Sequence, residues 1–416
     1  MLRLSEFDLI FLLVNIFLIF LLPNRWAPLS LLIGACYMTR SHGVEVGPLS
    51  FPVIRILIAA GYFRVIIRRQ SLKGKTNSLD WLVALWAACA IFSSVFHANF
   101  TAALIYRLGL VYDAAGFYFL FRVFFKTMDD IEGLCVAIAV LLMPVAIEMV
   151  FEKVTSYNFF FSDWAEVRDG KIRSRGPFSH SILAGTVGAV CLPLIISLWN
   201  QHRKATLVGL LSCLTMIITS TSSGPIIAGF AAIAALFSWR YRNFMRPLRY
   251  MGAFLYVLLD LYMKDPAYYI IARIDLTGSS TGWHRAKLIQ SAFEHFSEWW
   301  IGGTDYTRHW MPTGVPWSED HTDITNQYLA YGVIGGLPLM LIFIIILIRA
   351  FSFVGQMISE KNDILPHHKF MMWAFGSSLF AQAMTGLSIS YFDQSIIFLL
   401  LTLGGIATAK STCIQS

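Results

Sequence analysis

Apolar stretches of about 15–24 residues recur along almost the whole chain, and they constrain its fold more than any other feature. Each is near the length that an α-helix needs to cross roughly 30 Å of hydrocarbon. Of the 416 residues, 56% are hydrophobic and only 14% are charged, which excludes a soluble enzyme, a disordered chain and a nucleic-acid-binding domain. The sequence therefore predicts an all-α, polytopic transmembrane helix bundle.

The expected crossings are separated by short polar connections and two longer ones. They lie at 7–22, 26–40, 51–67, 79–98, 101–123, 131–150, 181–199, 205–220, 224–238, 250–263, 326–348, 370–389 and 394–409. The first two stretches are short and form either two crossings or a single interrupted crossing. We therefore expect 12 or 13 crossings. This divides the chain into a bundle over 1–263, a large loop over 264–325 and C-terminal transmembrane helices over 326–416.

Basic residues orient the predicted bundle. Four clusters lie in short connections: Arg68, Arg69, Lys73 and Lys75; His202, Arg203 and Lys204; Arg240, Arg242, Arg246 and Arg249; Arg349, Lys361 and Lys369. The positive-inside rule makes these four connections cytoplasmic. We expect a multi-pass protein of the bacterial inner membrane, so the loops at 151–180 and 264–325 then face the periplasm and the C-terminus faces the cytoplasm.

The 151–180 loop carries basic residues against this orientation rule. Arg173 and Arg175 precede a Gly176-Pro177 turn, and His180 stands immediately before the next apolar segment. Two arginines ahead of a helix N-terminus make a good site for a phosphate group. The alternative is that these arginines meet lipid headgroups at the interface.

The 264–325 loop is rich in tryptophan and histidine. Within it, residues 284–300 place apolar side chains at helical spacing, which predicts an amphipathic helix ended by Gly302-Gly303. Arg285 stands at the start of this helix. Exposed tryptophans in such a loop either offer apolar faces to sugar rings or anchor at the membrane interface.

A histidine at the end of this loop is a candidate general base. His321 lies between Asp320 and Asp323, either of which is placed to orient it, and a histidine titrates near neutrality. The alternative is a structural role, in which this loop histidine only caps a helix. A metal site of His321, Asp323, His309 and Asp305 has no standard ligand spacing, so we expect neither a metal nor a cofactor.

Several charged residues interrupt apolar runs. Arg55, Arg107 and Glu148 fall within expected crossings, where charge is costly and marks a polar cavity or an ion pair. Structural pairing and substrate contact are both open for each. The polar turn Thr221–Pro225 lies between two crossings on the same expected side and is placed to line the same cavity.

Taken in order, these motifs resemble the O-antigen ligase and O-antigen polymerase superfamily of polytopic membrane glycosyltransferases, over roughly residues 170–345. Three features carry the resemblance: the Arg175–His180 turn, Arg285 with the Gly302-Gly303 pair, and His321 eleven residues before Gly332-Val333-Ile334-Gly335. Many members have serine-arginine where this chain has Ser222-Ser223. Arg173 or an intramembrane arginine is then the substitute.

The resemblance implies a donor glycan carried on undecaprenyl diphosphate, and a lipid-facing site at the periplasmic side. The acceptor hydroxyl belongs to another glycan or to lipid A–core, and the sugar, the linkage and the choice of ligase, polymerase or protein glycosylation stay open. The implied roles are His321 as base, and Arg173, Arg175, Arg285, His180, Asp323, Arg55 and Arg107 as substrate-binding residues. Transfer would invert the anomeric carbon without a metal.

Two other classes fit less of the sequence. A flippase or secondary transporter of lipid-linked or anionic solutes would use intramembrane arginines, but it has little need of a long outer loop with His, Trp and Arg, and the chain shows no internal repeat. A purely structural or sensory membrane protein explains neither the contrarily placed arginines nor the His321 motif.

Overall fold

The computed structural model describes residues 5–47, 49–72, 74–168, 170–273, 282–359 and 365–413. Lys73 and Lys361 of the basic clusters lie outside the described residues. The helices are α1 (Glu6–Leu21), α2 (Pro28–Tyr37), α3 (Val53–Ile67), α4 (Ser78–Phe92), α5 (Phe100–Phe124), α6 (Met128–Thr155), α7 (Ser181–Ile196), α8 (Arg203–Thr219), α9 (Ser223–Phe237), α10 (Met245–Tyr262), α11 (Ile270–Arg273), α12 (Gly282–Glu294), α13 (Phe296–Trp299), α14 (Gln327–Ser359), α15 (Pro366–Thr385) and α16 (Ile396–Cys413).

Polar residues between the apolar runs begin several of these helices. Thr127 caps α6, where its side chain accepts a hydrogen bond from the Asp130 backbone N–H at 3.2 Å, and the Asp130 carboxylate in turn accepts from the Thr127 N–H at 3.0 Å. Asn77 and Asp80 form the same reciprocal pair at the start of α4. Such pairs satisfy backbone donors that have no partner within the helix.

The strands are short and form three separate antiparallel hairpins. They are β1 (Gly43–Val46) with β2 (Leu49–Pro52), β3 (Tyr157–Asn158) with β4 (Asp163–Trp164), and β5 (Glu166–Arg168) with β6 (Lys171–Arg173). The last two hairpins make up much of the predicted 151–180 loop. The pairing of β5 with β6 sets Glu166 opposite Arg173.

The structure confirms an all-α polytopic fold. Among the described residues, five segments are long and apolar enough to cross a membrane: Ser78–Phe96, Phe100–Phe124, Met128–Thr155, Ser223–Tyr262 and Gln327–Ile358. Ser181–Ile196 and Ile396–Thr412 are apolar but shorter. The expected crossings at 224–238 and 250–263 thus fall within one candidate segment. The total of 12 or 13 crossings stays a prediction.

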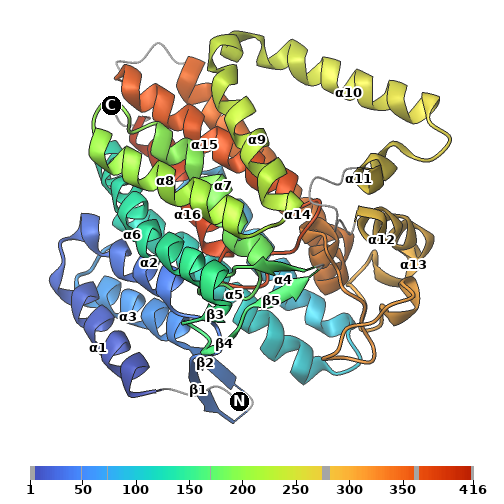
Figure 1. The fold of residues 1–416 in the computed structure, drawn as a ribbon, viewed down its shortest axis with the longest axis horizontal. Coiled ribbons are helices and arrows are strands. Elements are labelled where there is room, and N and C mark those ends of the chain that lie inside the picture. Colours follow the sequence, from blue (N-terminus) through green and yellow to red (C-terminus); the bar gives the residue numbers. More distant parts are fainter. Residues whose placement is uncertain are drawn as a thin grey trace.

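The apolar helices pack around α7, almost all of whose residues are buried. Helices α8, α9 and α15 surround it, α6 packs on α8, and α4 and α5 pack on α14 and α16 respectively. Figure 1 shows α10 reaching away from this bundle, and α10 buries none of its residues. Helices α12 and α13 lie on the side of the bundle next to α14.

The predicted amphipathic helix at 284–300 is two helices, α12 and α13, that meet at His295. Leu288, Ala292 and Trp299 are buried as its apolar face. Phe293, Phe296 and Trp300, however, are 67%, 39% and 45% exposed. The predicted apolar face is therefore correct at Leu288, Ala292 and Trp299 and wrong at Phe293, Phe296 and Trp300.

Candidate functional site

The turn from Arg173 to His180 is held in place by buried carboxylates. Glu152, near the end of α6, accepts hydrogen bonds from the backbone N–H groups of Arg175 and Gly176 at 2.8 and 2.9 Å. From the other side, Asp393 accepts from the Ser179 N–H at 2.9 Å. The two acids fix the backbone of the turn, so that its basic side chains project from a rigid base.

Arg173 points from the end of β6 toward the start of α9. Its Nη2 donates to Ser222 Oγ at 3.1 Å, and its side chain is 5% exposed. Its Nη1 also lies 3.8 Å from a carboxylate oxygen of Glu166, on the neighbouring strand. Arg173 therefore places its guanidinium beside the Ser222-Ser223 turn, where many members of the resembled family carry an arginine.

Arg285, near the N-terminus of α12, lies beside this same group. Burial lowers the pKa of Arg285, the positive charges of Arg173 and Arg168 lower it further, and only Asp323 opposes them. Its Nε is buried and makes no hydrogen bond to any residue that the structure describes. Two loops that are more than 100 residues apart in sequence thus bring Arg168, Arg173 and Arg285 together, and we call these three the arginine cluster.

Asp323 is the acid next to this cluster. Burial raises the pKa of Asp323, against the opposing charges of His284 and Arg285. Burial also lowers the pKa of His284, which favours the neutral imidazole. Asp323 and Glu166, which lies 3.8 Å from Arg173, are thus the acids that the structure shows beside the three guanidinium groups.

His180 occupies the N-cap of α7. Its Nδ1 accepts a hydrogen bond from the Ile182 N–H at 3.1 Å, which requires that nitrogen to be unprotonated. Burial lowers the pKa of His180, Glu166 raises it, and Arg173, Arg168 and Arg175 lower it again. His180 therefore adjoins the arginine cluster as a neutral cap of the helix.

His321 lies two residues before Asp323, within about 7 Å along an extended chain. Its Nδ1 is 2.7 Å from Ser318 Oγ. The partner that the structure gives this ring is therefore Ser318, and neither Asp320 nor Asp323. A histidine held through Nδ1 presents Nε2 on its other side.

The backbone around His321 is anchored at both ends. Thr307 donates its N–H to the Asp320 carbonyl at 2.9 Å, and its hydroxyl accepts from the Thr322 N–H at 3.1 Å. Further along, the Gln327 N–H donates to the Gly386 carbonyl at 2.7 Å. The segment around His321 therefore has an irregular backbone that is fixed by hydrogen bonds on both sides.

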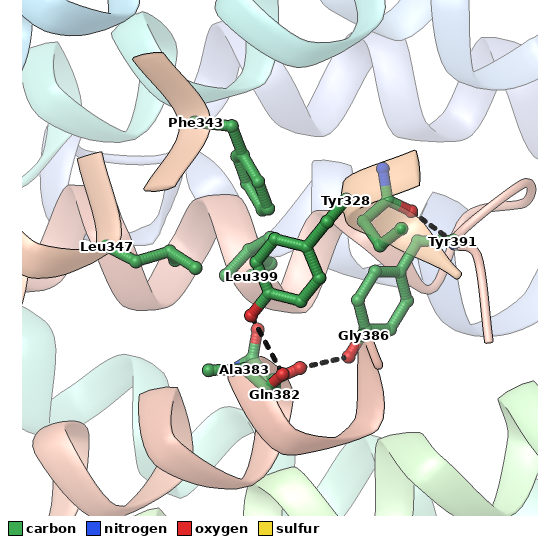
Figure 2. A pocket seen from close by; sticks show the side chains of 9 residues that line it. Tyr328, Phe343, Leu347, Gln382, Ala383, Gly386, Tyr391 and Leu399 are labelled. Atoms are coloured by element: carbon green, nitrogen blue, oxygen red, sulfur yellow. Dashed lines mark hydrogen bonds between the residues drawn. The ribbon is translucent and has the colours of Figure 1, made fainter. Parts of the chain in front are cut away.

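Figure 2 shows how the start of α14 is fixed against α15. Tyr328 donates to the Ala383 carbonyl at 2.8 Å, and Tyr391 donates to the Gln382 carbonyl at 3.0 Å. The Tyr391 N–H donates to Gln327 Oε1 at 2.6 Å. These bonds close a small apolar pocket, so we read it as packing that supports the His321 segment.

The glycine motifs lock the large loop onto α14. Helix α14 is interrupted at Gly335 and Gly336, and the chain at 300–304 inserts there. The Leu337 N–H donates to the Trp300 carbonyl at 2.9 Å. A Cβ on Gly303 would lie 2.2 Å from the Val333 carbonyl oxygen, and one on Gly336 would lie 2.4 Å from that of Ile301. Both glycines also have positive φ, so no other residue fits either position without strain.

Three expected substrate-binding arginines are held by other partners. Arg175 makes two hydrogen bonds to Asp163 at 2.6 and 2.8 Å, and its guanidinium lies over the Phe161 ring. Arg55 is paired with Asp113 through two hydrogen bonds of 2.8 and 2.9 Å.

Arg107 donates to Ser93 Oγ at 2.9 Å and contacts His97 and the Ile334 carbonyl. His97 in turn bonds Asp305. Arg107 thus joins α5 to the glycine junction. In the described part of the chain, no recorded contact brings Arg55 or Arg107 to the arginine cluster.

The sequence reading missed Ser318 and the two carboxylates Glu152 and Asp393. Ser318 belongs to a surface hollow beside His321, whose lining is Arg308, Gly314, Val315, Pro316, Trp317, Ser318 and Glu319. Trp317 is 77% exposed at this hollow, whereas Trp299 and Trp310 are buried and offer no face to a ligand. Only exposure separates these tryptophans, and sequence alone does not give it.

Comparison with known proteins bears on this arrangement. Residues 207–344 match a family model described as O-antigen ligase. The matched range runs from α8 into α14 and includes Arg285, Asp323, His321 and the interrupted helix. No curated protein gives a significant match. The match covers about a third of the chain, so over this range the multi-pass membrane protein is similar to O-antigen ligases, a family with glycosyltransferase activity of the ligase or polymerase type.

Proposed function

We propose that this protein transfers a glycan from undecaprenyl diphosphate to an acceptor hydroxyl at the periplasmic face of the bacterial inner membrane. The observation that carries the proposal is the convergence of Arg173 and Arg285, with Arg168, beside the segment of His321 and Asp323. Like charges gathered at one place are unfavourable unless an anion joins them, and a diphosphate is an anion of the right charge and size.

The arginine cluster would act on the leaving group. As the glycosidic bond breaks, its electron pair passes to the diphosphate oxygen, and negative charge grows there. Guanidinium groups fixed before the reaction stabilise this charge without reorganising, a task that a metal ion performs in other enzymes. Arg285 is the best placed, because its buried Nε has no hydrogen-bond acceptor among the described residues.

His321 would serve as the general base. In the tautomer that donates Nδ1–H to Ser318 Oγ, 2.7 Å away, Nε2 carries the lone pair that a base needs. Nε2 takes the proton of the acceptor hydroxyl as its oxygen attacks the anomeric carbon opposite the diphosphate. One C–O bond forms, one breaks, and the configuration at the anomeric carbon inverts.

The hollow next to His321 is the proposed seat of the acceptor. It combines an exposed indole, Trp317, with the polar side chains Arg308 and Glu319. This mixture suits a sugar, which presents both an apolar face and hydroxyl groups. The acceptor class follows from what fills the hollow: a glycan end for a polymerase, or lipid A–core for a ligase.

The test is a glycan profile of a deletion strain complemented with wild type, His321→Ala or the control His309→Ala. His309 is an exposed histidine of the same loop with Glu298 as its partner. We expect wild type and His309→Ala to restore the profile, and His321→Ala to lower transfer by about 10²–10⁴-fold, the usual contribution of a general base.

The profile also separates the acceptors. Long polymer left on undecaprenyl diphosphate indicates a ligase, and single repeat units indicate a polymerase. Full rescue by His321→Ala, at wild-type protein levels, would remove the histidine from the mechanism. An unchanged profile in the deletion strain would favour a transporter.

A further inference from the structure

At the opposite end of α6 from Glu152, a second group of polar side chains gathers where three helices begin. Glu132 and Glu152 are 20 residues apart on this helix, which is about 30 Å at 1.5 Å per residue. The group contains Glu132 from α6, His202 before α8, and His367 and His368 from the first turn of α15. The proposed reaction uses none of them.

Three histidines each place their Nε2 atom near the carboxylate of Glu132. His202 Nε2 is 3.1 Å from Glu132 Oε1, and the Nε2 atoms of His368 and His367 are 3.7 and 3.9 Å from Oε2. Ligand atoms of Glu132, His367 and His368 all lie within 4.8 Å of one another. Asp129 adds a carboxylate oxygen 3.4 Å from His368.

His368 gives an independent indication of a ligand. The residue is only 8% exposed and its Nε2 is buried. This nitrogen lies 3.4 Å from the Asp129 carboxylate and 3.7 Å from that of Glu132, without a well-aligned hydrogen bond to either. A metal ion between the ring nitrogen and a carboxylate would give both a close partner.

We propose that Glu132, His367 and His368 bind a divalent transition metal of the zinc class, with His202 as the fourth ligand. Two or three imidazoles and one carboxylate are a common donor set for Zn²⁺, and the ligand atoms need only close to about 2.0–2.2 Å from the ion. Such an ion would join the starts of α6, α8 and α15 at the end of the bundle remote from the arginine cluster, as a structural site.

A second group in the described chain, His295, Glu298 and His309, fits a metal less well. Glu298 is already an acceptor for the Trp310 Nε1–H at 3.1 Å and for His309. Both Glu298 and His309 are exposed. Because it offers the same kind of side chains without a buried histidine, this second group is the matched control.

The experiment is a Zn²⁺ titration of the full-length protein in nanodiscs after removal of bound metal with a chelator. We expect one ion per chain with a dissociation constant below about 1 μM. His368→Gln and Glu132→Gln should each weaken binding at least tenfold, whereas His309→Gln should leave it unchanged. Co²⁺ in place of Zn²⁺ should show the visible absorption of a tetrahedral site in wild type and lose it in His368→Gln.

Three results would overturn the site. Wild type that binds no Zn²⁺ below about 100 μM excludes it. Binding retained in both His368→Gln and Glu132→Gln assigns the ion to another place, and loss in His309→Gln assigns it to the loop. Thermal unfolding of each variant without metal checks folding, and the His367→Gln variant, at a more exposed position, repeats the test if His368→Gln is unstable.

Discussion

Two arginines within the helix bundle, Arg122 and Arg55, have surroundings that differ from those of Arg285 in the arginine cluster. Arg122 of α5 donates to both oxygens of Asp80 at 2.8 and 2.9 Å, and Arg55 is paired with Asp113 in the same manner. Arg285 instead has Arg173 and Arg168 as neighbours, and Asp323 is the acid that opposes their effect on it. Arg122 and Arg55 are each matched to a carboxylate by two hydrogen bonds, whereas the buried Nε of Arg285 makes none among the described residues.

This difference distinguishes arginines that stabilise the fold from arginines that are available to bind a ligand. A buried guanidinium that is matched to a carboxylate holds helices together and has no capacity left for an anion. A group of guanidinium side chains with too little negative charge around them is costly in the absence of a ligand, and functional sites are where proteins keep such costs. Whether a buried arginine is structural or functional therefore follows from the residues that it contacts.

We expect the largest change in stability from a substitution of Arg55, which tests whether this arginine is purely structural. The Arg55→Ala variant leaves Asp113 with only Arg40, at 2.9 Å, as a partner, so we expect a loss of about 3 kcal/mol in the free energy of unfolding. Its affinity for undecaprenyl diphosphate, per folded molecule, should stay within about twofold of wild type. Unchanged stability with lost affinity would move Arg55 into the donor site.

A smaller effect is expected at Asp323, the one acid that opposes Arg285 electrostatically. Asp323→Asn removes a negative charge that competes with the donor, so diphosphate binding should tighten by up to about fivefold. Because the pKa of Asp323 is raised, wild type should approach the affinity of the variant as pH falls and the carboxyl group is protonated. Equal pH profiles of binding in the two proteins would show that Asp323 does not act on the donor.

The sequence predicted the fold class and the order of most helices, because apolar runs of membrane length and capping residues such as Thr127 are local signals. It also predicted a turn before α7 and the end of the amphipathic segment at Gly302-Gly303, but not that Gly303 packs against the break in α14 at Gly335 and Gly336. It did not predict the break at His295, where the packing of the loop on the bundle overrides the helical periodicity.

The site was harder to predict because its parts are brought together only by folding. Arg173 and Arg285 both carried a signal, one through its placement against the orientation rule and the other through its position at a helix start. Nothing in the sequence showed that Arg175 is held by Asp163, or that Ser318 is the partner of His321. The histidines around Glu132 were missed for the same reason, since their ligand spacing exists only across three helices.

The central claim is that the arginine cluster binds the diphosphate of the donor, and equilibrium binding of undecaprenyl diphosphate in nanodiscs tests it most directly. Arg285→Ala should weaken binding at least about tenfold, the value of one charge-assisted hydrogen bond. The control, Arg25→Ala, removes an equal charge from a residue stacked near Trp26, and should bind within about twofold of wild type. Equal affinity of Arg285→Ala and wild type, or an equal loss in both variants, would contradict the account.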